Sequence, residues 1–163
     1  MSGCTMSDNI VTRNATVRDI PAIADLWKEL ADFHADRDRY LALSSDATER
    51  YADFILSQLT RESACLLVAE YQAAVIGFCF GFVRRNAPVF AVSEVGVVDD
   101  LVVQEEFRRN GVGQALLQSA YQWFTKRGIL RIEVGMLTTN EISTAFWREM
   151  GFEPYRETLK RNL

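Results

Sequence analysis

Phe107-Arg-Arg-Asn-Gly-Val-Gly-Gln114 links the apolar run Asp100-Leu-Val-Val103 to a helical stripe that begins at Val112. A strand that turns through glycines into a helix leaves the first amide groups of that helix unpaired, with the positive end of the helix dipole behind them. Such a turn binds anions, and phosphate groups in particular. Arg108 and Arg109 add positive charge beside it. The segment therefore predicts a site for a phosphate-bearing cofactor.

The same segment has three other interpretations: a P-loop, a dinucleotide-binding fingerprint and an ordinary loop. A P-loop needs Gly-Lys-Ser/Thr, and no such triplet follows Gly111. A dinucleotide fingerprint needs a third glycine where this chain has Leu116, although Glu133 lies at about the right distance for an acid that binds a ribose. An ordinary strand-to-helix loop with two glycines and a solvated arginine pair is the plainest alternative.

A second segment lies downstream and reads Asn140-Glu-Ile-Ser-Thr-Ala-Phe-Trp-Arg-Glu-Met-Gly-Phe152. Together with Arg108-x-x-Gly111-x-Gly113, it resembles the two signature segments of the GNAT superfamily of N-acetyltransferases, and the spacing between the two also fits. The resemblance runs from about Ile10 to the C-terminus. It implies the GNAT fold, acetyl-CoA (coenzyme A) as cofactor and an amine as the acetyl acceptor.

The resemblance also implies roles for the residues that match the family's motifs. The backbone of Leu101, Val102 and Val103 would pair with the pantetheine arm of the cofactor as an added strand does, and Asn140 would contact the same arm. Asn140 is equally suited to be the N-cap of a helix at Glu141, and one residue can do both. The amides of residues 109–114 would hold the pyrophosphate. The implied cofactor-binding residues are Leu101, Val102, Val103, Arg108, Arg109, Asn110, Gly111, Val112, Gly113, Gln114 and Asn140.

Acetyl transfer to an alkyl amine requires a base, because such an amine has a pKa of ~10.4 and is mostly protonated at neutral pH. Asp99-Asp100-Leu101 resembles the Glu-Asp-Leu pattern of small-amine acetyltransferases in the family, whose first acid faces the substrate. Asp99 is therefore the predicted catalytic base. Glu94 and Glu133 are further acids on the flanking strands, and an acid pair on a strand can also mark a bulge or a solvated face.

Trp147 stands where many relatives carry a tyrosine whose hydroxyl protonates the departing thiolate. An indole N–H is a donor only. Trp147 shares a helical face with Asn140 and Ser143, which predicts that it borders the site rather than the core and makes it the second catalytic candidate. The alternative is a packing tryptophan, with water, Tyr155 or the substrate supplying the proton. A thiolate leaves readily, since the thiol pKa is only ~8.5.

Composition narrows the class of protein. The chain has 163 residues, 48% of them hydrophobic, which predicts one domain at residues 10–163 after a flexible tail at residues 1–9. A net charge of −4 excludes a basic nucleic-acid footprint and mildly favours a cationic substrate. Three cysteines without metal-ligand spacing and a single histidine predict no metal site. Two of the cysteines lie in apolar runs, where a thiol is a small hydrophobe, which suits a reducing cytosol, so a cytoplasmic protein is expected. No apolar run approaches the ~20 residues of a membrane helix.

Hydrophobic periodicity predicts an α/β (α+β mixed) fold with a central mixed sheet flanked by helices. Strands are predicted at residues 10–17, 65–70, 74–83, 93–103, 129–136 and 153–163, and helices after an Asp19 cap and at residues 47–59, 112–126 and 141–150. The family resemblance implies that the strands at residues 93–103 and 129–136 run parallel but splay apart, with the pantetheine arm between them. The last strand would either close the sheet or pair across a homodimer.

These observations predict an acetyl-CoA-dependent N-acetyltransferase that acts by direct attack on a primary amine of a small molecule or peptide. None of the cysteines lies near the glycine turn in sequence, which disfavours an acyl-enzyme. Two rivals are a CoA-binding regulatory module that has lost catalysis and a dinucleotide-binding oxidoreductase.

Overall fold

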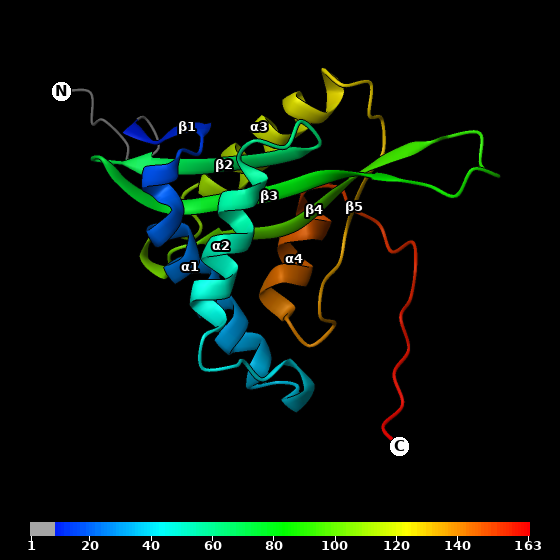
Figure 1. The fold of residues 1–163 in the computed structure, drawn as a ribbon, viewed down its shortest axis with the longest axis horizontal. Helices are drawn as coiled ribbons and strands as arrows, with labels where there is room; N and C mark the ends of the chain where they lie inside the picture. The colour runs from blue at the N-terminus through cyan, green and yellow to red at the C-terminus, as the bar shows by residue number, and fades with distance from the viewer. Residues whose placement is uncertain (1–8) are drawn as a thin grey trace.

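The computed structural model describes residues 9–163, which form a five-stranded sheet in the order β1-β2-β3-β4-β5 (Figure 1). The strands are β1 (Val11–Asn14), β2 (Ala64–Tyr71), β3 (Ala74–Arg85), β4 (Glu94–Val103) and β5 (Ile132–Val134). The helices are α1 (Ile20–Ala35), α2 (Ala47–Gln58), α3 (Val112–Thr125) and α4 (Glu141–Glu149), with short 3-10 turns η2 (Val17–Asp19), η3 (Arg39–Leu41) and η4 (Glu105–Phe107). Neighbouring strands are antiparallel except β4 and β5, which are parallel. The predicted mixed α/β fold is confirmed, whereas the predicted tail falls almost wholly outside the described residues.

Each face of the sheet has its own apolar cluster, because the strands alternate their side chains between the two faces. On one face, Ile23 of α1 and Ile55 of α2 pack with Phe78 and Phe80 of β3. On the other, α3 and α4 contribute the second cluster, whose largest fully buried member is Phe124. Figure 1 shows α1 and α2 lying over one side of the sheet, with α3 behind it.

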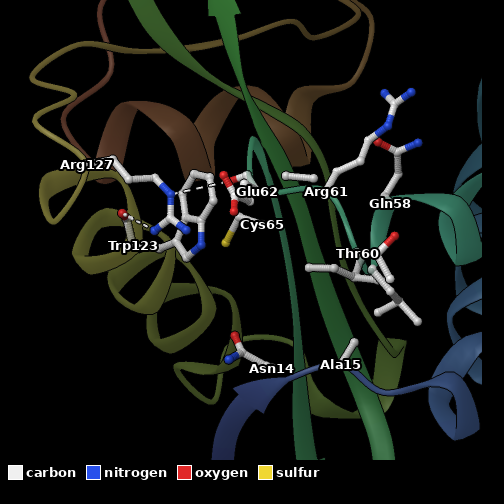
Figure 2. Close-up of a pocket in the computed structure, with 12 residues that line it drawn as sticks. Asn14, Ala15, Gln58, Thr60, Arg61, Glu62, Cys65, Trp123 and Arg127 are labelled. Carbon is white, nitrogen blue, oxygen red and sulfur yellow. Dashed lines mark hydrogen bonds between the residues drawn. The ribbon is translucent and has the colours of Figure 1, made fainter.

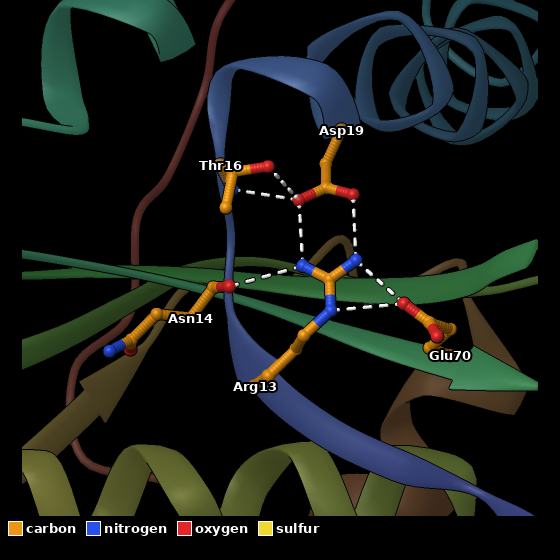
Figure 3. A network of polar contacts seen from close by, with 5 residues as sticks. All are labelled: Arg13, Asn14, Thr16, Asp19 and Glu70. Atoms are coloured by element: carbon orange, nitrogen blue, oxygen red, sulfur yellow. Dashed lines mark hydrogen bonds and ion pairs between the residues drawn. The ribbon is translucent and has the colours of Figure 1, made fainter. Parts of the chain in front are cut away.

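An ion-pair network fixes the place where α1 begins (Figure 3). The guanidinium of Arg13 on β1 donates to both carboxylate oxygens of Asp19, at 2.8 and 2.9 Å, and to Oε2 of Glu70 on β2 at 2.7 Å. The backbone N–H of Thr16 also donates to Asp19, at 2.7 Å. Asp19 is the N-cap of α1, as predicted, and a proline follows in the first turn, but its side chain bonds Arg13 and Thr16 rather than the helix amides. These bonds, that of Arg13 first, lower the pKa of Asp19 to about 2.

The predicted turn between β2 and β3 is confirmed, although no glycine is present. Tyr71 and Ala74 are paired across it, and the two residues between them, Gln72 and Ala73, have φ angles of 49° and 63°. Positive φ at both central residues gives the turn the twist that a two-residue hairpin requires.

The expectation for the C-terminus is wrong. Residues 153–163 form no strand, and the predicted strand at residues 129–136 is shortened to β5. The last eleven side chains are all exposed, so pairing would bury no apolar face, and Pro154 lacks an N–H for a ladder. Two contacts tie the segment down instead: the Arg131 guanidinium lies 3.8 Å from the centre of the Tyr155 ring, and Lys160 pairs with Asp38 in the loop after α1.

Candidate functional site

The outer edge of β4 opens halfway along the strand. β5 pairs only with Gly96, Val97 and Val98, whereas β4 continues to Val103. The parallel strands thus separate beyond Val98, as the family resemblance implied. The second half of β4 has a strand partner on only one side among the described residues.

The backbone N–H and C=O groups of β4 point alternately toward β3 and toward the open edge. The N–H of Gln104 donates to the carbonyl of Ile76, and the register places Val102 opposite Phe78 two residues before. In an antiparallel ladder every second residue bonds the partner strand, so Val102 uses its backbone groups on β3, while Leu101 and Val103 point theirs outward. The expectation for Val102 is therefore wrong: it cannot pair with a ligand along the open edge, and its side chain is buried against α1 and α2.

Arg108 fastens the glycine loop to the end of β4. Its Nε donates to the carbonyl oxygen of Val103 at 3.0 Å, and the side-chain amide of Asn110 donates to the carbonyl of Arg108 at 3.1 Å. The carbonyl of Val103 is thus already in use, which leaves the peptide groups of Leu101 as the free pair on this edge. Both side chains position the loop.

The loop presents unpaired amides at the start of α3. Arg109 and Gly111 have φ angles of 62° and 79°, which turn the chain into the helix. Among residues 9–163, none of the amides of residues 109–114 donates a hydrogen bond to another backbone group, and the first bond of this turn is that of Ala115 to the carbonyl of Gly111. The dipole of a helix of fourteen residues stands behind these amides. This arrangement can bind an anion with several oxygens.

The two glycines of the loop, Gly111 and Gly113, are required for different reasons. A Cβ on Gly111 would meet nothing within 4 Å, so the space in front of the loop is open and its glycine is required by the positive φ. A Cβ on Gly113 would lie 3.2 Å from the ring of Phe146 on α4 and 3.5 Å from Leu101. Gly113 therefore lets α4 pack closely on α3.

Asn140 is the N-cap of α4. Its side-chain oxygen accepts a hydrogen bond from the amide of Ser143 at 3.0 Å, and the residue is buried. Its NH₂ group donates to no residue among 9–163, so it can still reach a ligand. Asn140 also lines a cavity of about 340 Å³ between the ends of α1 and α4, together with Phe33 and Arg37.

Trp147 is placed differently from the expectation. Its side chain is 6% exposed and belongs to the apolar cluster beneath α3 and α4, where it packs against Phe146 and Phe152. Its Nε1 donates to the hydroxyl of Ser143 at 3.0 Å. The prediction that Trp147 borders the site rather than the core is wrong, because a large apolar ring one turn from Ser143 gains more from burial than from facing solvent.

A bulge brings two acids to the point where β4 and β5 separate. Phe80 of β3 lies opposite Asp100 and Gly81 opposite Val98, so Asp99 is an extra residue without a partner. Bulges change the direction of side chains and are frequent beside active sites. The side chain of Asp99 reaches solvent, yet desolvation by the protein around it still raises its pKa.

Asp100 is the better held of the two acids. The hydroxyl of Tyr51 on α2 donates to Oδ2 of Asp100 at 2.7 Å. Burial raises the pKa of Asp100 to about 6; the hydrogen bond from Tyr51 opposes this rise, and the charge of Asp99 adds to it. The sequence places Tyr51 within the helix predicted at residues 47–59, and nothing in the neighbouring residues shows that its hydroxyl reaches β4.

A second cavity of about 310 Å³ lies at the other end of the sheet, beside the start of β2 and the end of α3 (Figure 2). The guanidinium of Arg127 stacks 3.8 Å from the centre of the Trp123 ring in its wall. The loop after α2, the end of β1 at Asn14 and the buried Cys65 also line it. It is far from the glycine loop, which lies at the C-terminal end of β4.

The site combines a parallel strand pair that splays apart, a loop of unpaired amides before α3 and two acids where the strands separate. The model of the acetyltransferase (GNAT) family matches residues 24–152, more than three quarters of the chain. The chain belongs to the GNAT acetyltransferase family.

Relatives within this family resemble parts of the chain. The aminoglycoside N(6')-acetyltransferase type 1 of Klebsiella aerogenes is 28% identical over 101 residues, which cover 62% of this chain and 66% of that protein. The L-ornithine N5-acetyltransferase NATA1 of Arabidopsis thaliana is 29% identical over 83 residues, or 51% of this chain and 36% of that protein. The chain thus spans less than two thirds of the length of these relatives.

Solved structures share the fold. The tetramutant of the BH1408 protein from Bacillus halodurans has a TM-score of 0.82 at 18% identity, over 94% of this chain and 99% of that chain. The aminoglycoside N-acetyltransferase AAC(6')-Iy in complex with CoA has a TM-score of 0.74 at 19% identity, over 94% of each chain.

Residues 9–163 contain no cluster of three or more histidine, cysteine, aspartate or glutamate side chains that could hold a metal ion. None of their helices is long and apolar enough to cross a bilayer.

Proposed function

We propose that this GNAT-family chain is an acetyl-CoA-dependent N-acetyltransferase that transfers an acetyl group to a primary amine of a small molecule or peptide by direct attack. The observation that carries the proposal is the row of backbone N–H groups at residues 109–114. They donate no backbone hydrogen bond within residues 9–163, and they lie beside the open edge of β4.

The residues of this site fit coenzyme A. The amides of residues 109–114 would hold its pyrophosphate, and the open space in front of Gly111 leaves room for that group. The outward peptide groups of Leu101 would pair with the amides of the pantetheine arm, and the NH₂ group of Asn140 would reach the same arm. A structure of similar fold, AAC(6')-Iy, contains CoA.

The acids at the bulge suit the chemistry of an amine. Acetyl-CoA supplies a thioester whose acetyl group is transferred. The amine must lose a proton before it can attack, and Asp99 and Asp100 lie where β4 leaves β5, without an ion pair to any lysine or arginine of residues 9–163. An uncompensated acid pair attracts a cationic amine and can accept its proton.

The cysteines of the described chain do not suit an acyl-enzyme. Cys65 and Cys79 are buried, and burial raises the pKa of Cys65 to about 12 and that of Cys79 well above its usual value. A thiol must ionise to act as a nucleophile. Direct attack by the amine on the thioester is therefore the route we propose.

Calorimetry with coenzyme A, combined with thiol release from acetyl-CoA, tests the proposal. The wild-type protein should bind coenzyme A and release thiol with at least one amine from a panel of polyamines, aminoglycosides, amino acids and peptides. Gly111→Val should weaken coenzyme A binding by about tenfold or more, since a β-branched residue at a φ of +79° forces the loop to move.

Gly128→Val is the matched control. Gly128 has a φ of 74°, no atom within 4 Å of its absent Cβ, and a place just after the other end of α3. Its substitution should reduce stability in the same way and leave coenzyme A binding unchanged. Binding without thiol release from any amine would favour a regulatory module, and stabilisation by NAD without stabilisation by coenzyme A would contradict the proposal.

A further inference from the structure

The carboxylate of Asp100 is held on one side and free on the other. Its Oδ2 accepts the hydrogen bond from Tyr51 at 2.7 Å. Its Oδ1 receives no hydrogen bond from residues 9–163. The side chain lies opposite Phe80 in the register, hence on the face of the sheet that α1 and α2 cover, and it is only partly exposed. One oxygen is therefore fixed in direction, and the other remains available to an incoming N–H or water.

Tyr51 is itself fixed by aromatic neighbours. Its ring stacks on Trp27 of α1 with centroids 4.1 Å apart and planes 6° from parallel, and it lies 6.1 Å from the ring of Phe54. The Tyr51 side chain is almost fully buried. Because the ring cannot turn without breaking this stack, the direction of its O–H toward Asp100 is set by the packing of α1 on α2.

Asp99 has none of these supports. It is the extra residue of the bulge, its side chain is exposed, and no hydrogen bond or ion pair to residues 9–163 holds it. A free carboxylate on a bulge can attract a cation, but its orientation is not defined. The efficiency of a general base depends on a defined distance to the proton that it removes.

We infer that Asp100, oriented by Tyr51, is the group that accepts the proton of the substrate ammonium, directly or through one water, and that Asp99 serves to attract the amine. The inference rests on the proposed function. Asp100 would be the catalytic residue and Tyr51 a positioning residue, in place of the assignment of Asp99 as the base.

The proton balance is complete without a further reagent. The ammonium of the acceptor gives one proton to Oδ1 of Asp100 and becomes a neutral amine. Its nitrogen then forms the C–N bond to the acetyl carbon as the C–S bond breaks, and the second proton that the nitrogen loses goes to the departing thiolate. Asp100 releases its proton to solvent before the next cycle.

Among residues 9–163, three titratable groups interact with Asp100. They are Tyr51 from α2, Asp99 on β4 itself and the buried thiol of Cys79 on β3, whose own pKa is raised in part by the charge of Asp100. Among residues 9–163, α1 lies beside this pair through Trp27, whose ring stacks on that of Tyr51 and does not titrate. A pH profile that changes when Tyr51 alone is altered therefore reports on this pair.

Asparagine variants of the two acids test the assignment. Asp100→Asn should lower kcat/KM by about 100-fold or more at a pH near 8, the usual contribution of a positioned base. Asp99→Asn should raise KM several-fold and change kcat by less than about threefold. The opposite ranking, or two variants that both retain kcat, would overturn the inference.

The pH dependence of Tyr51→Phe provides the second test, since this change keeps the ring stack and removes only the hydroxyl. The hydrogen bond favours the carboxylate, so its loss should move the acidic limb of kcat/KM upward from about 6 by about one unit. The ionised fraction at about pH 6 would then fall from about one half to about one tenth, so kcat/KM would fall about fivefold there and hardly at all at about pH 8.5. If Tyr51→Phe lowered kcat/KM equally at every pH, the role of Tyr51 would be purely structural, and its positioning role would be refuted.

Tyr121→Phe is the control for this substitution. Tyr121 lies on α3, is partly buried, and its hydroxyl makes no hydrogen bond with residues 9–163. Its removal should leave the pH profile unchanged. Coenzyme A binding by each variant shows that the fold and the cofactor site are intact. If wild-type protein turns over no amine, the proposed function has failed; if it does and the acid variants rank the other way, only the assignment of Asp100 has failed.

Discussion

The link between Arg13 and Asp19 should contribute measurably to stability, and Asp19→Asn tests it. The carboxylate is almost fully buried, with 7% of its side chain exposed, and accepts two hydrogen bonds from one guanidinium (Figure 3). Its pKa falls from 3.8 to about 2 in the folded protein. At about 1.4 kcal/mol per pKa unit, ionised Asp19 stabilises the fold by about 2 kcal/mol at neutral pH, and Asp19→Asn should lose about that much.

The pH dependence has a definite sign. A carboxyl whose pKa is lower in the folded state stabilises the fold above its unfolded pKa, and this contribution disappears as pH falls through the folded pKa. For Asp19 the window runs from 3.8 down to about 2. The difference in unfolding free energy between wild type and Asp19→Asn should be constant from neutral pH to about pH 5 and about half as large at pH 3.

Urea unfolding followed by circular dichroism measures this difference at each pH. Asp25→Asn is the control, since Asp25 lies on the same helix, is exposed and forms no ion pair with residues 9–163, and its substitution should change the unfolding free energy by less than about 0.5 kcal/mol. A loss for Asp19→Asn below about 0.5 kcal/mol, or one that persists undiminished at pH 3, would refute the reasoning.

Three further outcomes are expected. Gly96→Ala should lower the unfolding free energy by about 1–3 kcal/mol in urea melts, since its Cβ would lie 2.8 Å from two atoms of the fully buried Phe124 ring; an unchanged midpoint would show that the ring can move. Trp147→Phe should cost about 1 kcal/mol through the lost bond to Ser143 while kcat of acetyl transfer stays within about twofold, and a large loss of kcat would restore a catalytic role. Cys65, whose pKa is raised to about 12 by burial, should resist thiol reagents at pH 8 until urea unfolds the protein, as peptide mapping can verify; rapid native labelling would contradict this.

Local signals fix much of this fold. The helix predicted at residues 112–126 is observed at Val112–Thr125, and that at residues 141–150 at Glu141–Glu149, because glycines lie beside their ends and apolar side chains recur at helical spacing between. The glycine loop was also visible as a strand-to-helix turn, because positive φ and unpaired helix amides follow from the residues themselves.

Contacts between distant residues were not visible. Trp147 and Asn140 were expected on one face that borders the site, yet both are buried: the indole lies in the apolar core, while the amide caps α4 and lines a cavity. The acid pair was found in the sequence, but which acid is held depends on a bulge set by the register of β3 against β4 and on Tyr51 from a helix 49 positions away.

By itself the sequence determined the alternation of strands and helices, the glycine turn before α3 and the family resemblance, since each depends on residues within about one turn or strand of each other. Only the tertiary structure decided that the backbone groups of Val102 bond to β3 and that residues 153–163 form no strand. It also decided that Trp147 is buried and that the hydroxyl of Tyr51 donates to Asp100. The reason is physical: strand register, a bulge and the burial of a ring depend on the total packing of both faces of the sheet, to which residues far apart in the chain contribute together.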